Sequence, residues 1–143
     1  MRELDRTEAL GLLATVSLGR IVFTQDALPA VRPVNHLLDG EDIVVRVLGG
    51  GALASLAAPT DAPGVVVAYE ADQIDPETHL GWSVVVTGYA RPVADPGDVD
   101  RYTAALRPWV GQPVTGTVRI RPDLVTGFQV EAVPSPPSSA PWG

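Results

Sequence analysis

The chain has 143 residues, of which 45% are hydrophobic, and it carries no cysteine and a formal net charge of −7. This length suits one domain with a core of its own. The lack of cysteine excludes disulfides, thiolate metal sites and a cysteine nucleophile. The acidic charge, with no cluster of basic residues, predicts no nucleic-acid partner.

The N-terminal segment predicts a soluble, cytoplasmic protein. Charged residues such as Arg2, Glu3 and Asp5 stand where a signal peptide would need an apolar run. No apolar stretch approaches the ~20 residues that a membrane-spanning helix requires. We therefore expect no membrane partner and a reducing compartment.

The first part of the chain contains one helix signal and one hairpin signal. Asp5 with Glu8 three residues later resembles a capping box, and this predicts a helix over residues 7–15. Asp39 and Gly40 form a strong turn signal between two apolar runs. The strands on either side of this turn are therefore expected to pair as a hairpin.

Most of the remaining chain is expected to form short strands. Asp95 and Pro96 supply an N-cap and a first helical residue, and apolar residues then repeat at helical spacing as far as Val110. This order favours a mainly β antiparallel barrel over a doubly wound sheet. The predicted strands are residues 18–23, 27–38, 43–48, 65–70, 82–93, 115–120 and 126–133, with a further short helix over residues 52–58.

A single domain over residues 1–133 is followed by a different kind of segment. Residues 134–143 contain four prolines and three serines. Such a segment buries too little apolar surface to offset the entropy of ordering it. We expect a flexible tail there.

Arg46 is the most informative single residue. In a strand it shares a face with Val44 and Leu48, because side chains alternate from one face to the other. A charge among apolar neighbours is costly unless it meets an anion. Two interpretations remain open: a salt bridge to Glu70 or Asp72, or the phosphate of a cofactor.

Three glycines at residues 49–51 follow this strand and precede a short helix. Backbone amides at such a place can bind phosphate, although a plain flexible loop is the alternative. The run Gly49-x-Gly51-x-x-Ala54 imitates a dinucleotide fingerprint. The helix is too short for a βαβ crossover, so we regard this match as false.

The sequence gives little support to a metal site or to a hydrolase active site. His36 and His79 lie in different segments, and no metal site is assigned. Ser55 and Ser83 lack the surroundings of a hydrolase nucleophile. Trp82 is interpreted first as a core residue and second as the lining of a pocket for an aromatic cofactor.

Several stretches resemble the pyridoxamine 5′-phosphate oxidase-like superfamily. The most specific are Arg-Pro-Val-Asn-His at residues 32–36 and Gly-Trp-Ser-Val at residues 81–84, the latter typical of the nitroimidazole-reductase-like branch. The similarity covers residues 5–131. It implies a six-stranded antiparallel split β-barrel, a homodimer, and flavin mononucleotide (FMN) in a groove formed by both subunits.

The resemblance also implies where the cofactor would lie. Pro33, Val34 and Asn35 would border the isoalloxazine ring. The phosphate would face Arg46, Leu48, Gly50, Gly51, Ala52 and Leu53. Trp82 and Ser83 would approach the cofactor from the partner subunit.

One position departs from the family pattern. Ala52 stands where relatives often carry a lysine that pairs with the phosphate. Without that charge, FMN binding is weakened, compensated by Arg46 and loop amides, or lost, and a deazaflavin or haem could occupy the groove instead. The implied function is an FMN-dependent oxidoreductase acting on a small molecule, with no catalytic side chain because the flavin carries the electron chemistry. The alternative is a non-catalytic or differently loaded cofactor-binding or sensing protein on the same barrel.

Overall fold

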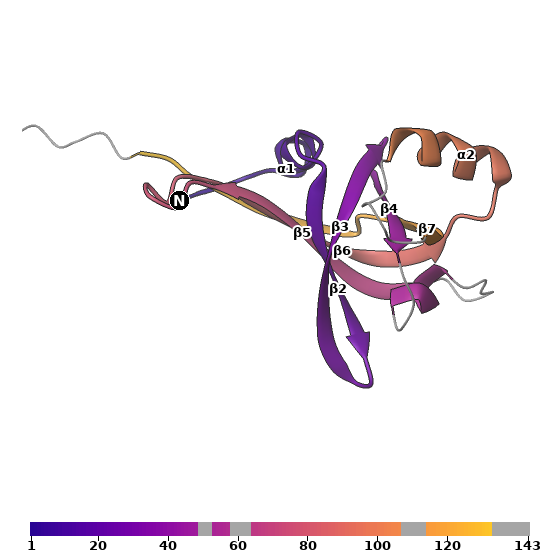
Figure 1. Cartoon of the computed structure of the whole chain (residues 1–143). Coiled ribbons are helices and arrows are strands. Elements are labelled where there is room, and N and C mark those ends of the chain that lie inside the picture. The colour runs from indigo at the N-terminus through magenta and orange to yellow at the C-terminus, as the bar shows by residue number, and fades with distance from the viewer. Residues whose placement is uncertain (49–52, 58–63, 107–113, 133–143) are drawn as a thin grey trace, which may run out of the picture.

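Strands dominate the computed structural model, which describes residues 1–48, 53–57, 64–106 and 114–132 (Figure 1). No helix within these ranges is long and apolar enough to cross a membrane. The predicted tail at residues 134–143 lies outside the described residues. The elements are β1 (Arg2–Glu3), α1 (Arg6–Leu13), β2 (Leu18–Gln25), β3 (Leu28–Asp39), β4 (Asp42–Leu48), the 3₁₀ helix η1 (Leu53–Ala57), β5 (Val65–Ile74), β6 (Gly81–Pro92), α2 (Pro96–Ala105), β7 (Val114–Ile120) and β8 (Leu124–Val130).

Six of the strands form a closed antiparallel barrel, as the sequence predicted. The order is β6, β5, β2, β3, β4 and β7, and β7 pairs with β6 again to complete the ring. β8 extends the sheet by pairing with the first half of β6, and the short β1 pairs with β8. β1 was not predicted, because two residues are too few to show an alternating pattern.

β6 pairs with two different strands along the same edge. It pairs with β8 from Gly81 to Thr87 and with β7 from Ala90 to Pro92. Gly88 lies between these stretches, and a Cβ added there would overlap the carbonyl oxygen of Arg121. The switch between partners therefore needs a residue without a side chain.

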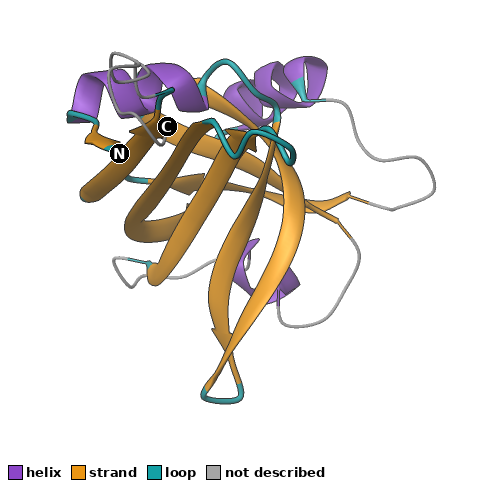
Figure 2. Ribbon diagram, turned by 90° about the vertical axis from the view of Figure 1, so that its left-hand side faces the viewer, coloured by secondary structure: helices purple, strands orange, loops and turns teal. Residues whose placement is uncertain are grey.

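The two α-helices both lie on the side of the molecule opposite the β2–β3 turn (Figure 2). Asp5 and Glu8 form the predicted capping box on α1, and the Asp95 side chain caps α2. The prediction that the second helix continues to Val110 was wrong, because Leu106 is already extended. A helix that reached Val110 would have Pro108 in its interior, where a proline has no N–H to donate and clashes with the preceding turn.

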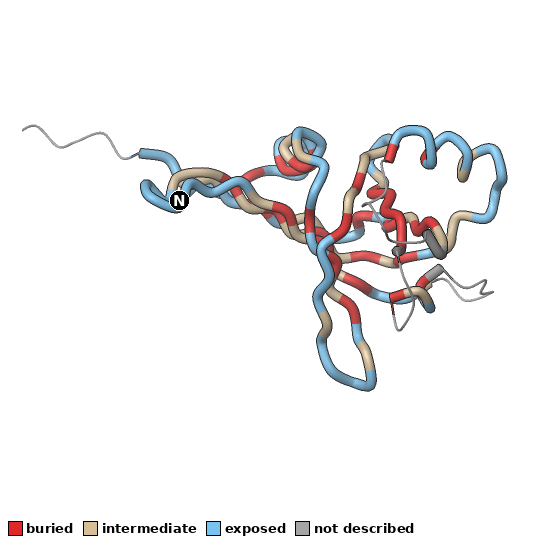
Figure 3. Tube along the Cα trace, in the orientation of Figure 1, coloured by how far each residue is buried: buried red, intermediate tan, exposed pale blue. Residues whose placement is uncertain are grey.

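Alternating side chains fill the barrel from the inside, as the pattern of buried positions along the strands shows (Figure 3). Along β5, Val67, Tyr69 and Ala71 face inward, and along β6 Val84 and Val86 do the same. α1 contributes buried side chains to the same core. The fold thus exposes the even-numbered positions of β5 on its outer face.

One polar pair lies inside this core. His36 is only 2% exposed, and its Nε2 is 2.9 Å from the carbonyl oxygen of Leu13, the last residue of α1. A carbonyl oxygen only accepts, so Nε2 carries the hydrogen and Nδ1 accepts a hydrogen bond from the Tyr69 hydroxyl. Burial lowers the pKa of His36 and raises that of Tyr69, so both side chains are neutral.

The neutral His36 ring predicts a loss of stability in acid. The unfolded chain takes up a proton near pH 6.5, whereas the folded ring resists it, so the free energy of unfolding should fall as the pH drops below about 6.5. The limiting slope is about 1.4 kcal/mol per pH unit. The free energies of unfolding of the wild type and of His36→Gln, measured in urea, should differ by an amount that changes with this slope. Taking the difference removes the contribution of other groups that titrate in the same range.

His79→Asn is the matched control. His79 is exposed, and its φ of 59° suits asparagine, so this variant removes a histidine without disturbing the core. A difference between wild type and His36→Gln that does not change with pH would contradict a neutral buried ring.

Candidate functional site

The outer face of the barrel is covered in one part and bare in another. α2 lies over β3 and β4, where Tyr102 and Leu106 pack on Val44 and Leu37. The outer faces of β8, β5 and β2 carry exposed apolar residues instead, including Leu124, Val66 and Leu18. Of the predicted site residues, Asn35 and Arg46 lie beside the part that α2 covers.

Arg46 lies under the end of α2. It is on the outer face of β4 opposite Thr117 of β7, and it is 9% exposed. Its Nη1 donates a 2.9 Å hydrogen bond to the carbonyl oxygen of Leu106, the residue that ends α2. Its Nε is buried and has no hydrogen-bond partner in the described part of the chain.

The alternative of a salt bridge from Arg46 to Glu70 or Asp72 was wrong. Arg20 pairs with both carboxylates instead, at 3.2 Å and 3.6 Å. The strand order explains the exchange, because β5 pairs with β2 and places Glu70 directly opposite Arg20. β4 lies on another side of the barrel, so Arg46 keeps an uncompensated positive charge among the described residues.

A small cavity adjoins this region. It measures about 220 Å³ and is lined by Ser17, Asn35, His36, Ala105 and Leu106. The backbone of Leu106 contacts Arg46, so the cavity and the buried guanidinium meet at the C-terminal end of α2. Polar groups and an uncompensated charge at a recess suit an anionic ligand.

The other predicted site residues divide between the two faces. Pro33 is exposed on the outer face, where Asn35 lies two residues farther along β3. Val34 and Leu53 are buried in the core. Gly50, Gly51 and Ala52 and the side chain of Leu48 lie outside the described residues.

Trp82 and Ser83 are not brought close to Arg46 within one chain. They begin β6 at the end of the β5–β6 hairpin, which points away from β4 in Figure 1. Trp82 is a buried core residue, as the first interpretation held. Ser83 is on the outer face with Asn35 but three strands away, about 14 Å at the usual strand spacing.

Sequence reasoning missed a charged cluster on the bare outer face. Arg20, Glu70 and Asp72 lie among apolar neighbours there, and one oxygen of Glu70 is buried without a partner in the described residues. Burial, with the neighbouring carboxyl of Asp72, raises the pKa of Glu70 to about 7, although Arg20 opposes the shift. Only the pairing of β2 with β5 reveals this cluster.

Comparison with known families and proteins gives consistent matches. A family model described as "Pyridoxamine 5'-phosphate oxidase" matches residues 5–129. An uncharacterized protein of Mycobacterium tuberculosis is 52% identical over 131 residues, which are 91% of this chain and 86% of that protein.

Solved structures show the same fold. The FAD binding protein of Mycobacterium smegmatis is 32% identical, with a TM-score of 0.67 over 91% of this chain and 98% of its own. A protein of Corynebacterium glutamicum named after pyridoxamine 5′-phosphate oxidase is 29% identical, with a TM-score of 0.71 over 90% and 98%. The FAD and heme binding protein of M. smegmatis, at 18% identity and a TM-score of 0.68 over 96% and 77%, shares the fold alone.

The charged cluster predicts opposite effects of two substitutions on one titration. Arg20→Gln removes the charge that favours the Glu70 carboxylate, so the pKa of Glu70 should rise above about 7. Asp72→Asn removes a repulsive charge, so the same pKa should fall. Carboxyl carbon shifts measured by NMR across the titration test both, and a wild-type Glu70 that titrates near its ordinary value would contradict the cluster.

Proposed function

The chain belongs to the pyridoxamine 5′-phosphate oxidase family, and from this premise we propose that it binds FMN and works as a flavin-dependent oxidoreductase. The observation that carries the proposal is the buried, uncompensated guanidinium of Arg46. A buried charge without a partner destabilises a protein unless an anion meets it. A flavin phosphate is an anion that this family is known to hold.

The residues present fit such a group. Arg46 would hold the phosphate through its free Nε, while its Nη1 stays on the carbonyl oxygen of Leu106. The backbone of residues 33–35 would border the isoalloxazine ring along β3. When bound, the flavin accepts and returns electrons, and the barrel supplies its position and its electrostatic surroundings.

The identity of the flavin is part of the proposal. The M. smegmatis relative at 32% identity is named for FAD, while Ala52 lacks the positive charge that relatives often bring to a phosphate. We propose FMN, with Arg46 as its main charged contact. Visible absorption spectra of the purified protein during separate titrations with FMN and FAD, and with haem, test this choice.

A homodimer is the second part of the proposal. Trp82 and Ser83 lie far from Arg46 in one chain, so a partner subunit is needed to bring this segment to the cofactor. The bare outer face offers a surface for that partner, since Val66 is 54% and Phe128 43% exposed on neighbouring parts of one sheet. Exposed apolar side chains on one sheet favour association with a second copy.

Arg46→Met tests the phosphate contact. Methionine fills a similar volume without a charge, so FMN should bind about ten- to a hundredfold more weakly in calorimetric titration, the loss expected for a charge-assisted hydrogen bond. Arg6→Met is the matched control, because Arg6 also donates to a backbone carbonyl oxygen, that of Pro122, at 2.8 Å. Equal FMN affinity in wild type and Arg46→Met would remove Arg46 from the site.

Val66→Lys tests the dimer. The wild type should show twice the 15.0 kDa mass of one chain in light scattering. A lysine at this exposed position on β5 should shift the mass toward that of one chain and weaken FMN binding with it. Thr103→Lys adds the same charge on the exposed side of α2 and should change neither. A wild type with the mass of one chain would refute both the dimer and a groove built from two chains.

A further inference from the structure

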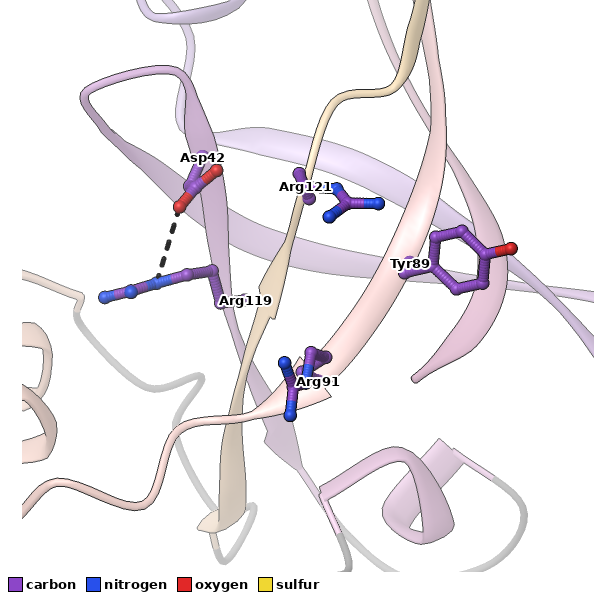
Figure 4. A pocket seen from close by; sticks show the side chains of 5 residues that line it. All are labelled: Asp42, Tyr89, Arg91, Arg119 and Arg121. Atoms are coloured by element: carbon purple, nitrogen blue, oxygen red, sulfur yellow. Dashed lines mark ion pairs between the residues drawn. The ribbon is translucent and has the colours of Figure 1, made fainter. Parts of the chain in front are cut away.

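A second cavity lies on the outer face of the barrel where the ring of strands closes. It measures about 210 Å³ and is lined by Asp42 of β4, Tyr89 and Arg91 of β6, Arg119 of β7, and Arg121 just after β7 (Figure 4). Three arginines and one aspartate therefore line one recess. This concentration of positive charge is unexpected in a protein whose net charge is −7.

The strand register places these arginines close together. Arg91 stands directly opposite Arg119 in the β6–β7 pairing. Two positions farther along, the backbone N–H of Arg121 donates to the carbonyl oxygen of Tyr89. Like charges placed directly across an antiparallel pair destabilise it unless something negative lies between them.

The described neighbours compensate these charges incompletely. Arg121 forms a 2.9 Å ion pair with Asp123. Arg119 lies 3.8 to 3.9 Å from the carboxylates of Asp39, Asp42 and Asp98 and donates to the hydroxyl of Tyr102, but its buried Nε lacks a hydrogen-bond partner among the described residues. Arg91 makes no ion pair or hydrogen bond with any residue that the structure describes.

We propose that this recess is a binding site for a small phosphate-bearing ligand, separate from the flavin site. Guanidinium groups match the oxygens of a phosphate in pairs, and a phosphate brings close to two negative charges where a carboxylate brings one. Arg91 and Arg119 also line a neighbouring cavity of about 220 Å³ with Pro92 and Val93. That second space leaves room for the organic part of the ligand.

α2 separates this recess from Arg46. Tyr102 of α2 packs on Val44 and also hydrogen-bonds with Arg119. Val44 lies between Asp42 and Arg46 on the outer face of β4. The two basic sites therefore lie on opposite sides of a buried aromatic residue.

Calorimetric titration with pyrophosphate at constant ionic strength tests the proposal. The wild type should bind pyrophosphate saturably, and Arg91→Gln should weaken this binding about ten- to a hundredfold, as expected for a charge-assisted contact. Asp42→Asn should strengthen binding, because it removes the competing carboxylate. Arg32→Gln removes an exposed guanidinium that also forms no ion pair in the described chain, and it should have no effect.

Three results would overturn the proposal. One is the absence of saturable binding in the wild type, and another is equal weakening by Arg91→Gln and Arg32→Gln. The third is succinate binding as tightly as pyrophosphate, which would mean a site for carboxylates. Circular dichroism checks that Arg91→Gln is folded, and Arg121→Gln replaces it if it is not.

A competition experiment separates this site from the flavin site. Saturation with FMN should leave pyrophosphate affinity unchanged, and displacement by FMN would make the recess part of the flavin site. The pyrophosphate titrations do not depend on the flavin proposal, so a failure to bind FMN would leave their outcome intact.

Discussion

Three residue pairs between β6 and β7 close the barrel, and the rest of the architecture depends on them. β6 can reach β7 only after it leaves β8, and the chain makes this switch at Gly88, where any side chain would meet the backbone after β7. The closure fixes the register of β7 against β4 as well. It therefore determines which residues of β4 and β7 face outward under α2.

This closed ring gives the inner and outer faces different roles. Among the described residues, the inner face is apolar except for His36 and Tyr69, which hydrogen-bond with each other, while His36 also hydrogen-bonds with the end of α1. A buried polar group costs free energy unless it is hydrogen-bonded, so this pair also fixes how α1 sits on the barrel. The outer face carries charges, cavities and exposed apolar side chains, and Asn35, Arg46 and Arg91 lie there.

Much of the fold could be predicted from the sequence because its signals are local. The Asp5 capping box, the Asp39-Gly40 turn and the alternation in β6 each involve residues close together in the chain. The order of the predicted elements already favoured an antiparallel barrel, and the family resemblance implied its six strands. The end of α2 was predicted too late, since the spacing of apolar residues outweighed the proline two positions after Leu106.

The candidate sites were harder to predict because they depend on register between distant strands. Arg46 was identified from its own strand, but its assumed partners Glu70 and Asp72 belong to Arg20 once β5 is placed beside β2. Arg91 and Arg119 are far apart in the sequence and belong to no motif that would mark a binding site. A shift of one residue in β7 would turn Arg119 toward the core, so only the closed ring reveals the cluster.

A bound anion would change the stability of the folded chain differently at Arg46 and at Arg91. Arg46 is almost fully buried, so its uncompensated charge destabilises the folded chain, and an anion that reaches it offsets part of that cost. Ligand binding at Arg46 is therefore coupled to folding. Arg91 is exposed and keeps its hydration, so an empty recess costs little beyond the repulsion from Arg119. The buried site thus favours a resident cofactor, whereas the exposed site favours a ligand that exchanges freely with solution.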